Sequence, residues 1–209
     1  TVGDIEGEPF LEAIRQLRHD VGRANVLYVH LTLVPYIKAA GEIKTKPTQQ
    51  SVALLMEKGI QPDIIICRTE KPLSQGVREK ISLFCNVPLE AVIEEMDVEV
   101  SVYELPTVFR GQKLDELIMN YLGLPPGDPD VSDWRKVVDI IKNPESEVTI
   151  GVVGKYTGLQ DSYKSIYEAL AHGGIANRLK VNIRRVESDK IETDGAEKLL
   201  DGIDGMLIP

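Results

Sequence analysis

The sequence predicts an α/β protein in which parallel strands alternate with helices. Short β-branched and apolar runs, such as residues 63–67 (DIIIC), are typical of parallel strands that are covered on both faces. Segments with apolar residues at helical spacing follow these runs, as in layered α/β folds. A proline-rich stretch at residues 124–130 (LPPGDPD) separates two such alternations. We therefore expect two α/β parts joined by a linker.

The first part begins with a predicted helix. Pro9 suits the first turn of a helix, and apolar residues then recur at helical spacing until Gly22. These apolar positions are Phe10, Ile14, Leu17 and Val21. Residues 26–34 (VLYVHLTLV) are predicted to form a buried strand. The remaining predictions are a polar loop at 41–49, a helix after it that carries Val52, Leu55 and Met56 on one face and stops at Gly59, strands at 63–67 and 91–93, and helices at 75–84 and 113–122.

One helix follows the proline-rich stretch, and the second α/β part begins at Val148. An amphipathic helix is predicted at residues 132–142, and Asn143 and Pro144 close it. The elements predicted beyond it are a strand within 148–156, a helix at 161–171, a strand at 181–186, a helix at 196–200 and a strand at 205–208. In open α/β sheets, ligands bind at the carboxyl ends of the strands, so we expect functional residues there.

Composition excludes several classes of function. The chain has 209 residues, 43% of them hydrophobic, and a net charge of −9, which argues against a broad nucleic-acid surface. Cys67 and Cys85 form no CxxC pair, so a reduced cytoplasmic setting is expected. No apolar run approaches the ~20 residues of a membrane helix, and no signal peptide is visible. The three histidines have no metal-ligand spacing; they are His19, His30 and His172.

Residues 41–49 (GEIKTKPTQ) are the most informative loop. Lys44 and Lys46 lie two residues apart, and hydroxyl and amide side chains surround them. A helix follows, and its N-terminus offers backbone N–H groups and a favourable dipole. These features suit a polyphosphate, but a solvated surface loop with ordinary lysines has the same pattern. Spacing alone leaves both interpretations open.

Two further patterns are equally open. Asp4 and Glu6 flank Ile5, and their carboxylates suit a functional role, in binding ligand hydroxyl and amino groups or a metal with further ligands elsewhere, or a stabilising position before a helix. Arg68 follows the predicted strand 63–67, where a ligand crevice opens in such sheets. Arginine suits phosphate, but a surface salt bridge explains Arg68 equally well.

Several motifs in order resemble the CTP synthase family over nearly the whole chain. They are residues 1–6 (TVGDIE), 30–36 (HLTLVPY), 41–49 (GEIKTKPTQ), 59–68 (GIQPDIIICR), 80–87 (KISLFCNV), 148–156 (VTIGVVGKY), 163–174 (YKSIYEALAHGG) and 204–209 (DGMLIP). The stretch from about 99 to 146 carries no such motif.

The resemblance implies a fold and an activity. It implies a parallel-sheet, P-loop-type amidoligase domain at residues 1–123, a linker with one helix at 124–147, and the start of a class I, flavodoxin-like glutaminase domain at 148–209. Members of the family use ATP to phosphorylate O4 of UTP, and ammonia from glutamine displaces the phosphate to give CTP. The resemblance also implies Mg²⁺, activation by GTP, feedback inhibition by CTP and a homotetramer.

Binding residues of the family are assigned to this chain only at positions where its sequence matches the family's motifs. The resemblance places UTP and CTP at Asp4, Ile5, Glu6, Lys44, Thr45, Lys46, Pro47, Thr48, Gln49 and Lys80. It places ATP near Arg68, Met96, Asp97 and Val98. It also implies that the phosphate loop and the magnesium carboxylates lie before Thr1, and that the glutaminase Cys, His and Glu follow Pro209. We therefore expect no catalytic residue and no metal ligand within this chain.

Two other functions remain compatible with the same residues. One is another glutamine-dependent ligase of this architecture, such as a cobyric-acid-type amidotransferase. The other is a nucleotide-sensing or filament-forming relative without catalysis. Selection of a pyrimidine nucleotide by residues 44–49 and Lys80 distinguishes the first alternative, and a catalytic cysteine beyond Pro209 argues against the second.

Overall fold

The computed structural model describes residues 2–209, apart from the side chain of Gln160. Thr1, the first residue of the TVGDIE motif, lies outside this range. The chain divides into two compact units, Thr1–Val131 and Ser132–Pro209. Within the described residues, no helix is long and apolar enough to cross a membrane.

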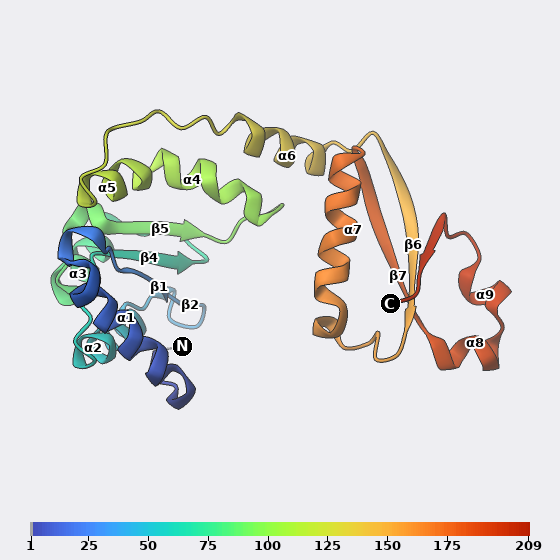
Figure 1. Cartoon of the computed structure of the whole chain (residues 1–209), viewed down its shortest axis with the longest axis horizontal. Helices are drawn as coiled ribbons and strands as arrows, with labels where there is room; N and C mark the ends of the chain where they lie inside the picture. The colour runs from blue at the N-terminus through green and yellow to red at the C-terminus, as the bar shows by residue number, and fades with distance from the viewer. Residues whose placement is uncertain (1) are drawn as a thin grey trace. The chain divides into compact units, whose positions relative to one another are not determined.

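A parallel three-stranded sheet forms the centre of the first unit. Its strands are β1 (Val29–Leu33), β4 (Ile64–Thr69) and β5 (Val92–Met96), in the order β1-β4-β5 (Figure 1). Successive side chains of a strand point to opposite faces, and the neighbours Ile64 and Ile65 are both fully buried. Strand β4 is therefore covered on both faces, as its apolar sequence predicts.

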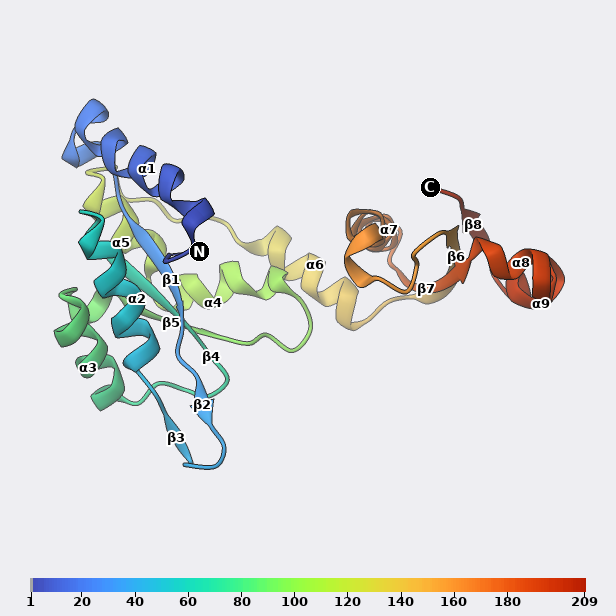
Figure 2. The same ribbon diagram turned by 90° about the horizontal axis from the view of Figure 1, so that it is seen from below.

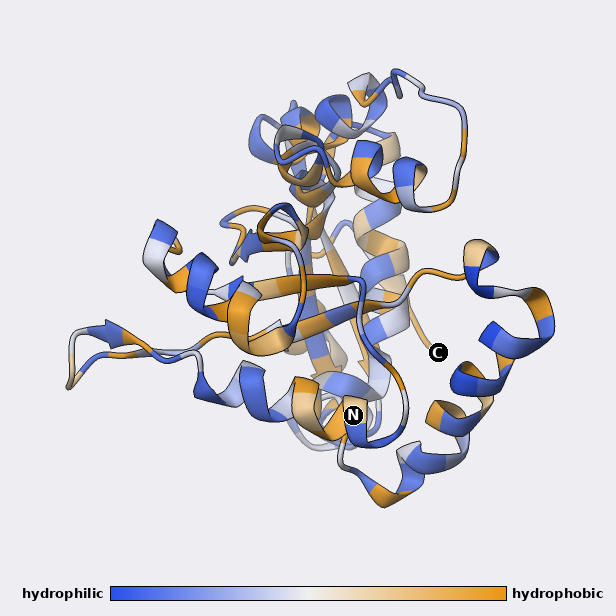
Figure 3. Ribbon diagram, turned by 90° about the vertical axis from the view of Figure 1, so that its left-hand side faces the viewer, coloured by the Kyte–Doolittle hydropathy of each residue, from blue (hydrophilic) through white to orange (hydrophobic). Residues whose placement is uncertain are grey.

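Helices cover this sheet from two sides. Helices α2 (Lys46–Glu57) and α3 (Gln75–Cys85) pack on one face, where His30 of β1 contacts Ser51 of α2. Helix α4 (Leu105–Gly111) packs beside β5 and faces Ile66 on the other side, and α5 (Leu114–Tyr121) adds Leu114 to the core. The hydrophobic colour follows the central strands, while the helices alternate between blue and orange segments (Figure 3). The predicted helices at 75–84 and 113–122 are confirmed to within about two residues.

Helix α1 (Glu8–Val21) forms as predicted, but its apolar stripe is not covered. Pro9 lies in its first turn, and Gly22 ends it with a φ of 86°. The side chains of the stripe are all exposed: Phe10, Ile14, Leu17 and Val21. The helix is held instead by its other face, where the Tyr28 hydroxyl donates to the Ile14 carbonyl and Lys58 pairs with Glu8.

The prediction of a buried strand over residues 26–34 is wrong in length and in burial. Strand β1 covers only Val29–Leu33, and one row of its side chains is exposed. Leu31 is 62% exposed and Leu33 is 58% exposed. Among the described residues, β1 pairs only with β4. Helix α4 packs beside β5, the strand at the opposite edge of this sheet. Apolar sequence therefore predicted the strand but not which of its faces is covered.

A hairpin interrupts the predicted polar loop. Strands β2 (Tyr36–Ile37) and β3 (Glu42–Ile43) pair antiparallel and project beside α2 (Figure 2). Helix α2 then begins at Lys46, so that residues 46–49 form its first turn rather than a loop. Pro47 explains this early start, because proline is well tolerated in the first turn of a helix.

The outer edge of β5 is closed by a side chain. The Gln112 side-chain amide accepts a hydrogen bond from the Glu94 N–H at 2.9 Å and donates one to the Glu94 carbonyl at 2.6 Å. This pair of bonds imitates a neighbouring strand. Unpaired edge groups are a liability in sheets, and here one glutamine satisfies both groups of the same residue.

The second unit has its own parallel sheet. Its strands are β6 (Ser146–Gly154), β7 (Leu179–Glu187) and β8 (Gly205–Leu207), in the order β7-β6-β8. Its helices are α6 (Ser132–Lys142), α7 (Lys164–Ala176), α8 (Ser188–Asp194) and α9 (Ala196–Leu200). The short 3₁₀ turns among residues 2–209 are η1 (Ile5–Gly7), η2 (Arg23–Asn25), η3 (Leu89–Ala91), η4 (Val102–Glu104) and η5 (Gln160–Tyr163). Helices α6 and α9 have the predicted bounds, and α8 was not predicted.

Both thiols should be inert in the folded protein. Cys67 and Cys85 are fully buried, and burial raises the pKa of Cys67 to about 12 and that of Cys85 to about 11. Since the thiolate is the reactive form, a thiol reagent at pH 8 should label neither until the chain is unfolded. Both thiols hold their proton more tightly in the folded chain than in the unfolded chain. The free energy of unfolding should therefore fall as the pH rises above the pKa of an unfolded cysteine, about 8.5, toward the folded pKa values. Mass spectrometry of native and denatured samples after labelling tests this.

Candidate nucleotide site

The predicted lysine segment is divided by burial. Lys44, Lys46 and Pro47 are exposed, whereas Thr45 is 5% exposed and Thr48 is fully buried. The Gln49 side-chain amide donates to the Thr45 hydroxyl at 3.0 Å across the first turn of α2. The segment therefore presents its cations to solvent and directs its hydroxyl groups inward.

A third lysine lies close to this segment. The Lys44 ammonium donates a hydrogen bond to the Glu42 carboxylate on β3. This bond, the charge of Lys44 and the charge of Lys80 on α3 together lower the pKa of Glu42. Lys44 and Lys80, 36 positions apart by their numbers, thus act on one carboxylate near the start of α2. Lys44, Lys80 and the exposed Lys46 are called the lysine cluster below. Ammonium groups of this kind can hold an external anion such as a phosphate chain.

The acidic segment at the start of the chain is exposed. Asp4, Ile5 and Glu6 lie at or within the 3₁₀ turn η1, and Ile5 is 87% exposed. The Gly7 N–H donates to the Asp4 carbonyl at 3.0 Å, which closes this turn just before α1. The carboxylates precede a helix, which is also where helix-end stabilisation places them. The structure therefore leaves both interpretations of this segment open.

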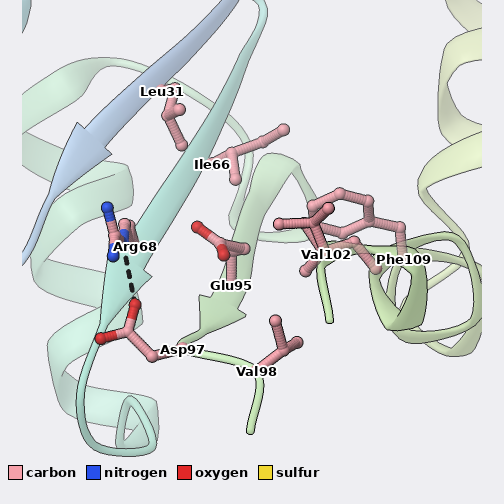
Figure 4. Close-up of a pocket in the computed structure, with 9 residues that line it drawn as sticks. Leu31, Ile66, Arg68, Glu95, Asp97, Val98, Val102 and Phe109 are labelled. Carbon is pink, nitrogen blue, oxygen red and sulfur yellow. Dashed lines mark hydrogen bonds and ion pairs between the residues drawn. The ribbon is translucent and has the colours of Figure 1, made fainter. Parts of the chain in front are cut away.

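A pocket of about 680 Å³ opens at the carboxyl ends of β4 and β5. Figure 4 shows Arg68, Glu95 and Asp97 at one side and Val102 and Phe109 at the other. The full lining is Leu31, Ile66, Arg68, Glu95, Asp97, Val98, Val102, Leu105 and Phe109. Apolar walls with a few convergent polar groups are typical of small-molecule sites.

An ion pair defines the polar side of this pocket. The Arg68 Nε donates to the Asp97 carboxylate at 2.8 Å, and this bond raises the pKa of Arg68 (Figure 4). Burial raises the pKa of Glu95, the charge of Arg68 opposes that rise, and the charge of Asp97 adds to it. The pocket therefore combines one cation with two carboxylates beside an apolar wall. This set suits a ligand with an apolar ring and polar groups at its edge.

The sequence located three of these residues and missed others. Arg68, Asp97 and Val98, three of the residues that the resemblance assigns to ATP, line this pocket together. Met96 lies between Glu95 and Asp97 and is absent from the lining, because neighbouring residues of an extended chain point to opposite sides. Glu95 was missed, although its position two residues before Asp97 was a usable signal. Nothing in the sequence predicted that Phe109 would lie here.

A second arrangement lies at the carboxyl end of β6, in the other unit. Tyr156 has a φ of 60° and is 70% exposed. The Glu187 carboxylate accepts hydrogen bonds from the Thr157 hydroxyl at 2.7 Å and the Gly158 N–H at 3.1 Å. These bonds lower the pKa of Glu187 and fix the loop after the strand. Left-handed backbone at a bulky residue is uncommon, and such residues cluster at functional sites.

The structure offers no assignment for a metal. Among residues 2–209, no group of three or more His, Cys, Asp or Glu side chains is placed to hold a metal ion. We therefore assign no Mg²⁺ ligand to this part of the chain and derive no chemical step through the ion.

Comparison with known proteins identifies the family. The family described as CTP synthase N-terminus matches residues 1–124. The chain belongs to the CTP synthase family. The match includes the residues of the first unit that carry both the lysine cluster and the pocket.

Curated relatives match the chain along its whole length. A CTP synthase of Rhizorhabdus wittichii is 55% identical over 212 residues, which cover 100% of this chain and 39% of that relative. A CTP synthase of Methanocaldococcus jannaschii is 54% identical over 215 residues, which cover 100% of this chain and 40% of that relative. The chain thus spans about two fifths of the length of the curated CTP synthases that it resembles.

Proposed function

We propose that this chain is part of an enzyme that converts UTP to CTP. In this reaction ATP transfers its γ-phosphoryl group to O4 of UTP, which releases ADP. Ammonia from glutamine then attacks C4, and inorganic phosphate leaves. The observation that carries the proposal is the start of α2, where Lys44 and Lys46 are exposed beside the buried Thr45 and Thr48, in a chain of this family.

The pyrimidine nucleotide is proposed to bind at the lysine cluster. Lys44, Lys46 and Lys80 would bind its triphosphate, because charge-assisted hydrogen bonds to phosphate are short and strong. Pro47 and Gln49 lie in the same first turn of α2, beside the buried Thr45 and Thr48. Asp4, Ile5 and Glu6 are proposed to contribute to UTP and CTP binding, with their carboxylates accepting from ligand donors.

ATP is proposed to bind at the pocket beside β5. The apolar wall would receive the adenine ring, and Arg68, Asp97 and Val98 would hold the nucleoside edge. Met96 would contribute through its backbone, because its side chain is not part of the pocket lining. Both nucleotides would then be positioned by one sheet and the helices that cover it.

The rest of the family's organisation is proposed for the full-length protein. Residues 1–123 would belong to a P-loop-type amidoligase domain, 124–147 to a linker, and 148–209 to a class I, flavodoxin-like glutaminase domain. The boundary between the two compact units, after Val131, falls inside that linker. Glutamine, Mg²⁺, activation by GTP, feedback by CTP and a homotetramer belong to the same proposal.

The proposal is tested by product formation in the full-length protein that carries this chain. CTP should form from UTP and ATP with ammonium chloride, and also with glutamine. Product from ammonia alone would keep the amidoligase half and reject the glutaminase half. Absence of product from both sources would reject the proposal and favour a nucleotide-sensing relative.

Arg68 provides a separate test of the ATP pocket. Arg68→Ala should raise the KM for ATP about tenfold, the effect expected from losing one charged hydrogen bond of ~1.4 kcal/mol. The KM for UTP should stay unchanged. Arg68→Lys keeps the charge but not the planar guanidinium, so it should recover only part of the loss. Steady-state kinetics with either nucleotide varied would detect this, and an equal rise in both KM values would contradict the assignment.

A further inference from the structure

Buried hydroxyl groups join the first turn of α2, which carries Lys46, to strand β1 of the sheet. The Thr48 hydroxyl of α2 donates to the Leu33 carbonyl of β1 at 3.1 Å and lies 3.2 Å from the Thr32 hydroxyl. Thr48 is fully buried and Thr32 is 6% exposed. Thr32 is paired in register with Cys67 of β4. Thr48 therefore ties the first turn of α2 to the carboxyl end of β1, the strand that pairs with β4.

A second contact joins the same two elements one helical turn later. The Ser51 hydroxyl lies 2.9 Å from the His30 Nε2, again between α2 and β1. Ser51 follows Thr48 by three positions, so the two hydroxyl groups lie on one side of the helix. Thr48 is in the turn that carries Lys46, whereas Ser51 lies beyond it.

We propose that Thr48 is a positioning residue for the lysine cluster and does not itself bind the nucleotide. Its single hydroxyl proton is used by the Leu33 carbonyl, and its side chain is closed to solvent. Lys44 and Lys46 lie four and two positions before Thr48, so this hydrogen bond fixes the backbone from which both lysine side chains extend. This inference rests on the proposed function of Lys44 and Lys46.

The end of β1 that accepts the Thr48 hydrogen bond also pairs with β4 at Arg68. Leu33 is paired with Arg68, and the Val34 N–H donates to the Arg68 carbonyl at 2.8 Å. The strand end that receives the Thr48 hydroxyl is thus the one that holds the backbone of Arg68. Removal of the Thr48 hydroxyl should displace the backbone of the lysines rather than that of Arg68, because the Arg68 backbone keeps its own hydrogen bonds to β1 and β5.

The test compares three single variants in the full-length protein. Thr48→Val keeps the side-chain volume but places a methyl group against the Leu33 carbonyl. It should raise the KM for UTP about tenfold, while kcat, the KM for ATP and glutamine hydrolysis stay near their original values. Thr48→Ser restores the hydroxyl and should restore the KM for UTP. Ser51→Ala removes a hydroxyl from the same helix and should leave that KM unchanged.

The outcomes separate this inference from the function on which it rests. If Thr48→Val and Ser51→Ala alter the KM for UTP equally, or if both lower all activities together, Thr48 is only structural and the inference is overturned. If Thr48→Val is silent while Lys44→Ala raises the KM for UTP, the inference fails and the proposed function stands. If Lys44→Ala is also silent, the proposed function of the cluster fails as well.

Discussion

Replacing Lys44 or Lys80 by alanine in the full-length protein should lower kcat/KM for UTP about tenfold to a hundredfold, the range expected from losing a charged hydrogen bond of about 1.5–3 kcal/mol. Lys44 donates a hydrogen bond to the Glu42 carboxylate, and the charge of Lys80 also lowers the pKa of that carboxyl, so both cations act near the start of α2. Glutamine hydrolysis should change little, because neither lysine belongs to the second unit. Assays of CTP formation and of glutamate release on the same samples measure the two effects.

A matched control accounts for the loss of charge alone. Lys198 is an exposed lysine on α9, and Lys198→Ala removes one positive charge from the other unit without touching the cluster. Its kcat/KM for UTP should stay within about twofold of the parent, as expected for a screened surface charge. Equal loss of both activities in Lys44→Ala would indicate damaged folding, and no loss would remove this lysine from the nucleotide site.

Gly174→Ala should destabilise the second unit by about 1–3 kcal/mol, the usual effect of overpacking a tight contact. A Cβ atom at this position of α7 would lie 2.7 Å from the Leu179 carbonyl oxygen and 2.7 Å from a methyl carbon of Val181. A backbone carbonyl cannot move aside as a flexible side chain can, so α7 would have to shift away from β7. Urea unfolding followed by circular dichroism gives the change in the free energy of unfolding.

The preceding residue supplies the control for this prediction. A Cβ atom on Gly173 would meet nothing within 4 Å, although Gly173 lies in the same helix. Gly173→Ala should therefore stabilise the unit by about 0.5–1 kcal/mol, because alanine favours the helical backbone more than glycine does. Opposite signs at two adjacent glycines would establish close packing of α7 on β7, whereas stabilisation by both substitutions would refute it.

The order of elements was predictable because each carries its signal locally. Residues 63–67 and 132–142 have the strand and helix patterns that the structure confirms as β4 and α6. The β2–β3 hairpin was missed because strands of two residues leave no periodicity to detect. Helix α4 lies in the stretch without family motifs, and no prediction was made there. Burial failed at β1, since a sequence does not state which neighbours cover a strand.

The candidate site was predictable in residue identity but not in orientation. The lysines and Arg68 were found because cations beside a helix start or a strand end suit phosphate. Thr45 and Thr48 were grouped with the lysines, since all lie in one motif. The structure separates them, because Thr45 and Thr48, three positions apart, are buried, while Lys46 and Pro47 between them are exposed. Thr32 joins the site only through its tertiary contact with Thr48, which no spacing rule describes.

The exposed row of side chains on β1 affects how the chain behaves in solution. Within the described part of the chain, β1 has one unpaired edge, and a strand with such an edge and exposed leucines at positions 31 and 33 offers a template on which another chain can add. The net charge of −9 opposes such association at low salt, but salt screens that repulsion. Raising the ionic strength should therefore promote association of the 209-residue chain, and this strand contributes to it together with the exposed apolar stripe of α1.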